Sequence, residues 1–510
     1  MSNAVTQKRN VNNASESSFL IEFIQLLFDV ISNLLSGLKN QNEIINQLQQ
    51  ELKELKVKLA NTQKVFSPKN EKTISSKKTR RKRGAQAGRK PRTRNIPKNL
   101  PKEKIDVDFP EIPQCSICGK SYLHVKSLDK ITNQINIFIS VVHQLVTRFT
   151  YKKDCKCNSQ PEILTAPPVK TVIKKSILTT ATLVNLIIMK YFLAVPIYRY
   201  RQFLMATGYP LSSGTVENNF KKIGILLEPV YHRMIQEVRK SKIWNADETR
   251  WKVFEHIEGK SSYLWWLWVF ASQNVVLYII DPTRSANVIK KINNQSNRII
   301  AADRYSAYEA IKGKTVKIAY CWVHLRRDFI NLKSQKILKD DPVIGKWVDD
   351  WLSAIKKIFT LNNKRLKSVS EKQFDKLTAK LYFATDKLRQ KTEENVSCKF
   401  QKTILNSFKK RFSGYTLFID DPNIPIHNNR AERLLKTGIN GRKNYLGNVS
   451  KDSVSHTQIF LSIIATANNN NVSPQLWFKE YLTAIAENDS KLLKEESLEL
   501  YVNKLLNPTS

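Results

Sequence analysis

Five short apolar runs between residues 240 and 325 constrain the fold of this chain more than any other feature. They are rich in Val, Ile and aromatic residues, a composition typical of β-strands. The runs are 240–251, 261–272, 274–281, 297–303 and 316–325. Helical patterns follow the third run at 283–292 and the fourth run at "SAYEAIKG". We therefore expect a five-stranded α/β domain in the middle of the chain.

Three acidic residues near these runs form a candidate site. Asp303 closes the fourth run and Asp247 follows the strand-like start of the first, positions where open α/β sheets place their ligands. If the two strands are neighbours, the two carboxylates converge at one edge of the sheet. Glu432 lies beside the apolar face of the helical segment 427–438, near enough to face that edge. Such oxygen ligands suit two Mg²⁺ or Mn²⁺ ions and phosphoryl transfer; the alternative is three unrelated acids.

The charge of the chain points to a polyanionic partner. The 510 residues carry 84 Lys and Arg against 44 Asp and Glu, a net charge of +40. Nucleic acid is the first candidate and an anionic membrane surface the second, while solvated lysines are the plain alternative. The segment 69–104 holds 15 Lys or Arg and two Glu, and reads as a DNA-contacting linker or a solvated tether. The candidate DNA contacts in it are Arg80, Arg81, Lys82, Arg83, Arg89, Lys90 and Arg92.

The segments on either side of this linker predict two small modules. In the helical stretch 19–62, an apolar seam at spacings of three and four predicts a dimerising coiled coil, or a lone amphipathic helix folded back on its domain. The seam residues are Ile45, Leu48, Leu52, Leu55 and Leu59. Downstream, Cys115, Cys118, Cys155 and Cys157 form two close pairs joined by a hairpin-like stretch. Four thiolates so held predict a structural Zn²⁺ site, with reduced structural thiols as the alternative.

The remaining segments read as helical. Residues 176–240 predict either a helix-turn-helix DNA reader or a supporting bundle, with Ser212 or Ser213 at a helix start. Residues 325–412 are long enough for an inserted helical subdomain. The apolar stretch 19–38 contains Glu22 and Asp29, so it predicts an amphipathic helix and no secretory signal. Six cysteines do not make a secreted disulfide framework in a chain of this length, and we expect a cytoplasmic protein that does not enter a membrane.

Several motifs, in one order along nearly the whole chain, resemble the insertion-sequence-sixty-six family of bacterial DDE transposases. The zipper-like helix, the cysteine pairs and the basic linker stand in the family's order. The matching motifs are "RGAQAGRKPR" (83–92), "KYFLAVPIYRYRQ" (190–202), "DETRW" (247–251), "DRYSAY" (303–308), "CWVHLRRDF" (321–329), "NNRAERLL" (428–435), "GRKNYLG" (441–447) and "LSIIATANNN" (461–470).

The resemblance implies an RNase H-like catalytic domain whose Asp247, Asp303 and Glu432 bind Mg²⁺, with Glu248 in a secondary role. It implies hydrolysis of a phosphodiester at a transposon end, followed by attack of the exposed 3′-OH on target DNA. The implied partners are terminal inverted repeats, target DNA, a second copy of the chain or more, and small accessory proteins. A DNA-binding derivative without catalysis and a structure-selective nuclease are the alternatives.

Chemistry suggests supporting roles for residues within these motifs. Basic side chains of the second and third motifs can neutralise phosphates; they are Arg326, Arg327, Arg442 and Lys443. His324 can contact a phosphate or assist proton transfer, or be an ordinary hydrogen-bonded histidine. Trp251 is a candidate for stacking on bases. The family usually has an aspartate where this chain has His427, and if that aspartate supports the metal ligands this copy is weakened.

Together these observations predict a multidomain α+β protein with seven parts. The parts are a coiled-coil helix (19–65), a basic linker (66–106), a zinc-binding β module (107–165), a helical, DNA-binding region (166–240), a catalytic domain (241–330 and 415–470), a helical insertion in it (331–414) and a helical tail (471–510).

Overall fold

The protein is described by a computed structural model that covers residues 117, 141–152 and 163–507, with gaps at 257, 259–261, 294–296, 314–315, 335–340 and 397. The predicted coiled coil, basic linker and four zinc ligands lie outside the described residues. The first described elements are two short strands, β1 (Thr150–Lys152) and β2 (Ile163–Thr165), which pair in antiparallel fashion.

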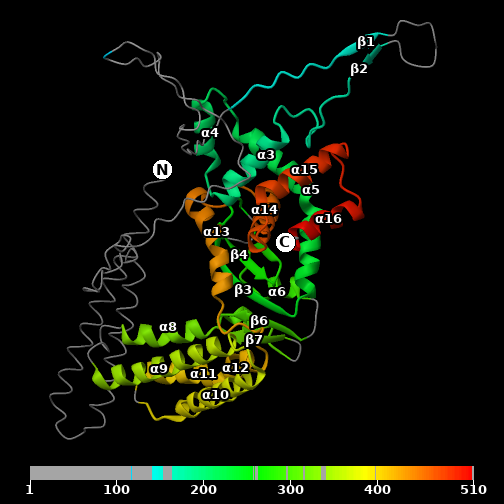
Figure 1. The fold of residues 1–510 in the computed structure, drawn as a ribbon. Coiled ribbons are helices and arrows are strands. Elements are labelled where there is room, and N and C mark those ends of the chain that lie inside the picture. Colours follow the sequence, from blue (N-terminus) through cyan, green and yellow to red (C-terminus); the bar gives the residue numbers. More distant parts are fainter. Residues whose placement is uncertain are drawn as a thin grey trace, which may run out of the picture. The chain divides into compact units, whose positions relative to one another are not determined.

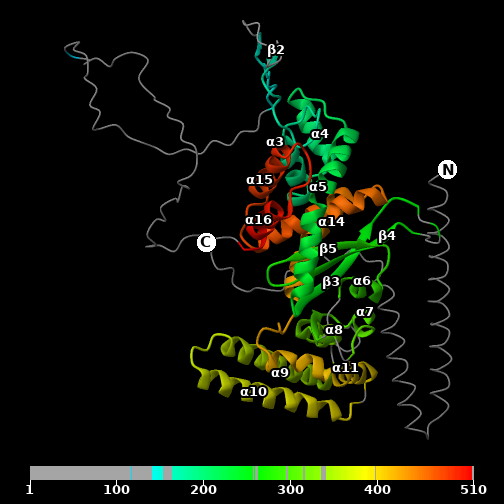
Figure 2. The ribbon, with the colours of Figure 1, turned by 90° about the vertical axis from the view of Figure 1, so that its right-hand side faces the viewer.

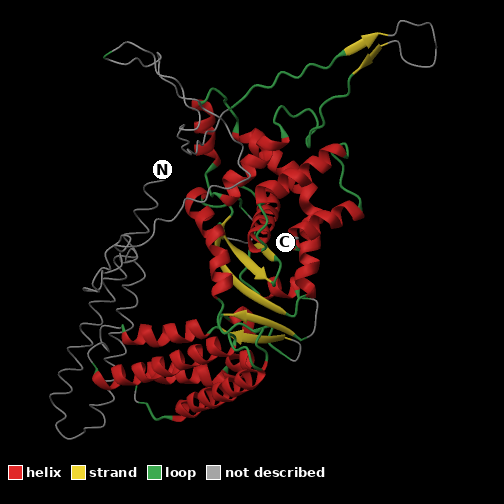
Figure 3. Ribbon diagram, viewed as in Figure 1, coloured by secondary structure: helices red, strands yellow, loops and turns green. Residues whose placement is uncertain are grey.

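A five-stranded mixed sheet forms the centre of the described chain, as predicted (Figure 3). Its strands are β3 (Ile243–Lys252), β4 (Leu264–Ala271), β5 (Val276–Asp281), β6 (Arg298–Ala302) and β7 (Val316–Tyr320). The spatial order is β5-β4-β3-β6-β7. The first three strands form an antiparallel meander, and β6 and β7 run parallel to β3. The sheet therefore changes from antiparallel to parallel pairing between β3 and β6.

The two faces of β3 carry different chemistry because side chains alternate along a strand. Asn245, Asp247, Thr249 and Trp251 share one face, and Glu248 lies on the other. Helix α13 (Asn429–Tyr445) covers the first face. It packs closely there because Gly438 has no side chain, and a Cβ at that position would overlap the Cδ2 atom of Leu267 on β4. The glycine allows the helix to approach the sheet.

Helix α14 (Lys451–Asn469) shields the outer edge of the sheet. Polar residues one turn apart on α14 bond to the free backbone of β5: Thr466 Oγ1 accepts from Val276 N at 3.0 Å and Ser462 Oγ from Tyr278 N at 2.8 Å. An exposed strand edge would otherwise be a template for pairing with another chain. The remaining face of α14 is buried against α5 (Ser213–Lys240). Thus α14 both closes the edge and joins the sheet to the helices before it.

The helices that precede and follow the sheet pack together on α14 and α5 (Figure 1). They are α3 (Thr180–Ile187), the π-helix η2 (Ile188–Phe192), α4 (Ile197–Ala206), α15 (Pro474–Glu487) and α16 (Glu495–Leu506). The predicted helix start is confirmed at Ser212, whose side chain caps α5 by accepting from Thr215 N at 3.0 Å. Within the described residues, no helix is long and apolar enough to span a membrane.

The segment between β7 and α13 is helical, as the sequence predicted for residues 325–412. It consists of α8 (Trp322–Lys333), α9 (Pro342–Arg365), α10 (Glu371–Gln390), the 3₁₀ turn η3 (Lys391–Glu393), α11 (Lys399–Lys410) and α12 (Phe412–Asp420). Helices α9 and α10 lie side by side (Figures 1 and 2). The buried guanidinium of Arg365 donates to the carbonyls of Phe418 at 2.6 Å and Ile419 at 2.9 Å, tying α9 to the end of α12.

Candidate active site between beta3, beta6 and helix alpha13

The register of β3 and β6 brings Asp247 and Asp303 together. The two strands are parallel neighbours, and Asn245 lies opposite Ala301. Continued by two residues, this register places Asp247 opposite Asp303, which directly follows the last residue of β6. Asp247 lies inside β3, within the run 240–251 that the sequence predicted as a strand, on the part of that strand that extends past β6. The condition set for the convergence of the two acids, that their strands are neighbours, is therefore met.

Asn428 holds the start of α13 against the same part of β3. Its amide donates from Nδ2 to the carbonyl of Ala246 at 2.7 Å, and its Oδ1 accepts from Asn245 Nδ2 at 3.0 Å. Its backbone N–H also lies 3.2 Å from Cys321 Sγ at the start of α8. Asn428 is the N-cap residue of α13, but its side chain bonds to the strand and makes no capping bond. Glu432 follows in the first turn of the helix.

Electrostatics show that the three acids share one environment. Burial is the main cause that raises the pKa of Asp247, to about 8, and the negative charges of Glu248, Asp303 and Glu432 raise it further. A hydrogen bond from the backbone N–H of Glu248, 2.9 Å from Asp247 Oδ1, acts in the opposite direction. The mutual repulsion of these carboxylates means that nearby positive charge does not fully compensate their negative charge.

This shortage of positive charge is what a bound cation would relieve. Among the described residues, no three His, Cys, Asp or Glu side chains stand close enough together to hold a metal ion as they are placed. In the described chain, Glu432 Oε1 is nevertheless buried and has no hydrogen-bond partner. A buried carboxylate oxygen without a partner is costly. Its position beside Asp247 and Asp303, together with the all-oxygen donor set, fits a hard cation such as Mg²⁺.

His324 stands at the edge of this cluster. Its Nε2 atom is 3.6 Å from Glu432 Oε1, and its buried Nδ1 has no hydrogen-bond partner within the described part of the chain. Burial and the positive charge of Arg327 lower the pKa of His324, against the opposing influence of Asp303 and Glu432. The imidazole is therefore neutral at physiological pH, and its geometry differs from that of an ordinary histidine with both nitrogens satisfied.

Glu248 has a different environment on the opposite face of β3. Its side chain is only 1% exposed, and Oε1 accepts from Arg284 Nε at 2.8 Å and Nη2 at 2.6 Å. Tyr308 donates its hydroxyl to Oε2 at 2.7 Å. Both carboxylate oxygens are thus committed to partners inside the protein. This arrangement separates the two adjacent acids of the "DET" motif, because Asp247 faces α13 and Glu248 does not.

The partners of Glu248 also hold the loop that carries Asp303. The guanidinium of Arg284 stacks over the ring of Tyr305 at 3.6 Å, and Tyr305 donates its hydroxyl to the carbonyl of Arg284 at 2.7 Å. The backbone N–H of Tyr305 in turn donates to Asp303 Oδ1 at 2.8 Å. Sequence reasoning missed Arg284, and only its position just after a strand could have drawn attention to it.

The other predicted site residues divide into four groups. Arg326, Arg327 and Lys443 are exposed and free to meet a polyanion. Arg442 is partly committed, because its guanidinium donates to Thr249 Oγ1 at 3.2 Å and to the carbonyl of Arg250. The predicted stacking of Trp251 on bases is wrong, because the ring is fully buried and its Nε1 donates to Asn448 Oδ1 at 2.8 Å. The linker cations and the four zinc cysteines are outside the described residues.

His427 lies directly before the N-cap residue of α13. Its neighbours fix the start of α13: the backbone N–H of Trp322 donates to Ile426 O at 3.1 Å, and Asn428 makes the bonds given above. The Nδ1 atom of His427 is buried and has no hydrogen-bond partner in the described chain. The expectation that His427 weakens this copy, if the family's aspartate supports the metal ligands, stays a prediction.

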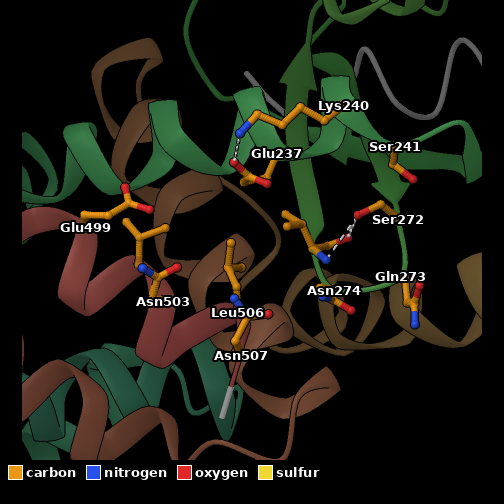
Figure 4. Close-up of a pocket in the computed structure, with 12 residues that line it drawn as sticks. Glu237, Lys240, Ser241, Ser272, Gln273, Asn274, Glu499, Asn503, Leu506 and Asn507 are labelled. Carbon is orange, nitrogen blue, oxygen red and sulfur yellow. Dashed lines mark hydrogen bonds and ion pairs between the residues drawn. The ribbon is translucent and has the colours of Figure 1, made fainter. Parts of the chain in front are cut away.

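A hollow of about 290 Å³ lies elsewhere, where α5 and α16 meet the β4–β5 turn (Figure 4). Glu237 and Lys240 line it from α5, Gln273 and Asn274 from the turn, and Asn503 from α16. Because Asn245 pairs with Ala271, this turn lies beside the beginning of β3. None of the three candidate acids lines the hollow, so we do not place the active site there.

Comparison with known proteins agrees with the motifs. The family model described as "Transposase IS66 family" matches residues 175–454, a range that contains all five strands of the sheet, α13 and the three acids. Uncharacterized protein y4jD of Sinorhizobium fredii is 22% identical over 438 residues, which cover 81% of this chain and 82% of the relative. Uncharacterized protein y4hP of the same organism is 22% identical over 505 residues, covering 92% and 87%.

Proposed function

Because the chain belongs to the IS66 family of transposases, we propose that it binds the ends of a transposable element and cuts and joins DNA at Asp247, Asp303 and Glu432. The observation that carries this proposal is the convergence of three elements. Parallel pairing aligns the strand positions of the two aspartates, and the bonds of Asn428 attach the start of the Glu432 helix to the same stretch of β3.

The topology supports an RNase H-like catalytic domain. An antiparallel meander extended by two parallel strands, in the order β5-β4-β3-β6-β7, agrees with that expectation. The long helical segment between β7 and α13 fits an insertion in the catalytic domain, so that Glu432 follows the insertion in the sequence while the two aspartates precede it. On this proposal, residues 241–330 and 415–470 form one catalytic domain.

We assign the three acids as ligands of two Mg²⁺ or Mn²⁺ ions. When bound, such ions activate the attacking oxygen and stabilise the leaving oxygen of a phosphoryl transfer. The protein itself holds the carboxylates in place, and it leaves Asp247 only partly exposed. Neutral His324 is placed to accept a proton beside Glu432. Exposed Arg326 and Arg327 on α8 are suited to neutralise the phosphates of the bound strand.

Cleavage of end-labelled DNA from the terminus of the element tests this proposal. Wild type is compared with Asp303→Asn, Asp247→Asn and Glu432→Gln, with and without Mg²⁺. Asp350→Asn is the matched control, because Asp350 is an exposed acid on α9. We expect metal-dependent cleavage that the three variants lose and the control keeps.

Three other outcomes would redirect the assignment. DNA binding with no metal-dependent cleavage would mean a transposase-derived binding protein. Cleavage without strand transfer would favour a structure-selective nuclease. Cleavage that persists in all three variants would mean that these acids do not form the active site.

The N-terminal modules complete the proposal. We propose that Cys115, Cys118, Cys155 and Cys157 hold a structural Zn²⁺ ion, that the helix at 19–65 joins two copies of the chain, and that the linker at 66–106 lies on DNA. Metal content of wild type and of a Cys115→Ser variant, measured by mass spectrometry, tests the first point. One equivalent of zinc is expected in wild type and none in the variant.

A further inference from the structure

Helix α13 presents a row of positive charge beside the candidate active site. Its exposed residues Arg433, Lys436, Asn440 and Lys443 follow one another at spacings of three, four and three. These spacings place them on one face of the helix, because an α-helix has 3.6 residues per turn. The opposite face, which includes Ala431, Leu435 and Gly438, is buried. The exposed face is therefore a separate surface of the same helix.

The three cations of this face are available to a partner. In the described part of the chain, none of Arg433, Lys436 and Lys443 forms an ion pair, although many other basic side chains do. The only acid on α13 is Glu432, which the helical geometry places between the buried and the exposed face. A polyanion lying on the exposed face would thus pass next to Glu432.

A hollow of about 220 Å³ adjoins this face. Phe192, Leu193 and Ala194 line it from the end of η2, and Thr437, Asn440, Lys443 and Asn444 line it from α13. Asn444 Nδ2 donates to the carbonyl of Ala194 at 2.9 Å, which fixes the two walls together. The Phe192 side chain is 41% exposed. An apolar ring, a cation and polar amides around one hollow suit a flat aromatic group attached to a phosphate.

We propose that the exposed face of α13 is the docking surface for the DNA strand that enters the active site, and that the hollow at Phe192 receives one unpaired base of that strand. This inference rests on the proposed function. The distance from Arg433 to Lys443 along the helix is about 15 Å, which matches about four phosphates of a duplex strand. The strand would run from the hollow along Lys443 and Lys436 to Arg433, with Glu432 beside it.

The salt dependence of DNA binding tests the row of charge. A fluorescein-labelled 40-base-pair duplex is titrated with the full chain at several salt concentrations, without added divalent ions, so that binding is measured independently of catalysis. Each cation that contacts a phosphate contributes about 0.9 to the slope of log K against log salt. In the triple variant Arg433→Gln, Lys436→Gln, Lys443→Gln, the magnitude of this negative slope should decrease by about 2 to 3.

A matched triple variant on α10 separates this effect from the general positive charge. Lys372, Lys376 and Lys380 are also exposed and follow one face of their helix. Lys372→Gln, Lys376→Gln, Lys380→Gln removes the same charge and should leave the slope nearly unchanged. An equal loss of slope in both variants, or no loss in the α13 variant, would overturn the docking surface. Neither outcome bears on whether the three acids cleave DNA.

Duplexes with different ends test the hollow. A duplex with three unpaired nucleotides at one end should bind about fivefold or more tightly than a blunt duplex, because stacking of a base on an aromatic ring is favourable. Phe192→Ala should abolish this preference. Phe203→Ala is the control, since Phe203 is 40% exposed on α4. If the preference for unpaired ends persists in Phe192→Ala, or is also lost in Phe203→Ala, the hollow does not bind an unpaired base.

Discussion

The ion pair between Glu248 and Arg284 gives a quantitative prediction about how the site is held. Glu248 is almost fully buried, whereas the Arg284 side chain is 34% exposed. Removing one partner of a fully buried pair costs about 3–5 kcal/mol, because the other charge stays buried without compensation. Since water can replace part of the Arg284 interaction, we expect Arg284→Gln to destabilise the domain by about 2–3 kcal/mol.

The loss should depend on pH in a defined direction. Burial raises the pKa of Glu248, and the bonds from Tyr308 and Arg284 oppose this rise. Without Arg284 the pKa of Glu248 rises further above its value in the unfolded chain. A carboxyl with a raised pKa in the folded state destabilises that state increasingly as the pH rises above the unfolded value. The deficit of Arg284→Gln should therefore be larger at pH 8 than at pH 5, where Glu248 can bind a proton.

Thermal unfolding of a double-mutant cycle measures both effects. The cycle contains Arg284→Gln, Glu248→Gln and the double variant, at pH 5 and pH 8. The double variant should lose about 1–2 kcal/mol less than the sum of the two single losses. Arg389→Gln, which breaks an exposed pair with Asp386, is the control and should cost less than about 1 kcal/mol. Additive losses, or a deficit that is larger at pH 5, would refute the reasoning.

Three further predictions concern Asn428, Trp251 and Asp247. Asn428→Ala leaves the Ala246 carbonyl and the Asn245 amide without their buried partner, so it should lower the free energy of unfolding by about 2–4 kcal/mol. DNA cleavage should also fall further than in the control Gly214→Ala, where a helical glycine has open space around it. Equal cleavage by both variants would contradict this. Trp251→Phe removes the hydrogen bond to Asn448 and should lower the free energy of unfolding, measured by thermal unfolding, by about 1–3 kcal/mol, with DNA affinity unchanged. Weaker DNA binding by the folded variant would mean that Trp251 contacts a base after all. Because the pKa of Asp247 is raised to about 8, protons compete with metal ions for this carboxylate below that pH. Calorimetry should therefore find that Mn²⁺ binds about tenfold or more tightly at pH 8.5 than at pH 6.5. A Mn²⁺ affinity that does not vary with pH would contradict the assignment of Asp247 as a metal ligand.

The sequence predicted the parts of the fold that depend on local pattern. All five strands are confirmed because each is a short run of β-branched and aromatic residues, and most of these side chains are buried. The cap at Ser212 is confirmed because a hydroxyl before an apolar helical pattern is a local signal. The sequence left open whether the strands of Asp247 and Asp303 are neighbours, and the pairing of β3 with β6 shows that they are.

Other features could not be predicted because they depend on which face a side chain occupies after folding. Trp251 was expected to meet DNA, but the strand alternation turns it toward α13 and Asn448. The same alternation separates Asp247 from Glu248, which the sequence shows only as adjacent acids. Arg284 contacts Glu248 across 36 positions of sequence, and Asn428 contacts Asn245 across 183. No spacing rule connects such pairs before the sheet is formed.

Titration of the full chain with Mn²⁺ by isothermal calorimetry tests most directly whether Asp247, Asp303 and Glu432 form one metal site. Binding to wild type should be lost or greatly weakened in Asp247→Asn, in Asp303→Asn and in Glu432→Gln, each measured alone. The adjacent Glu248→Gln should keep it, because that carboxylate is committed to Arg284 and Tyr308 on the other face of the strand. Mn²⁺ binding that is unchanged in the three variants, or lost equally in Glu248→Gln, would contradict the account.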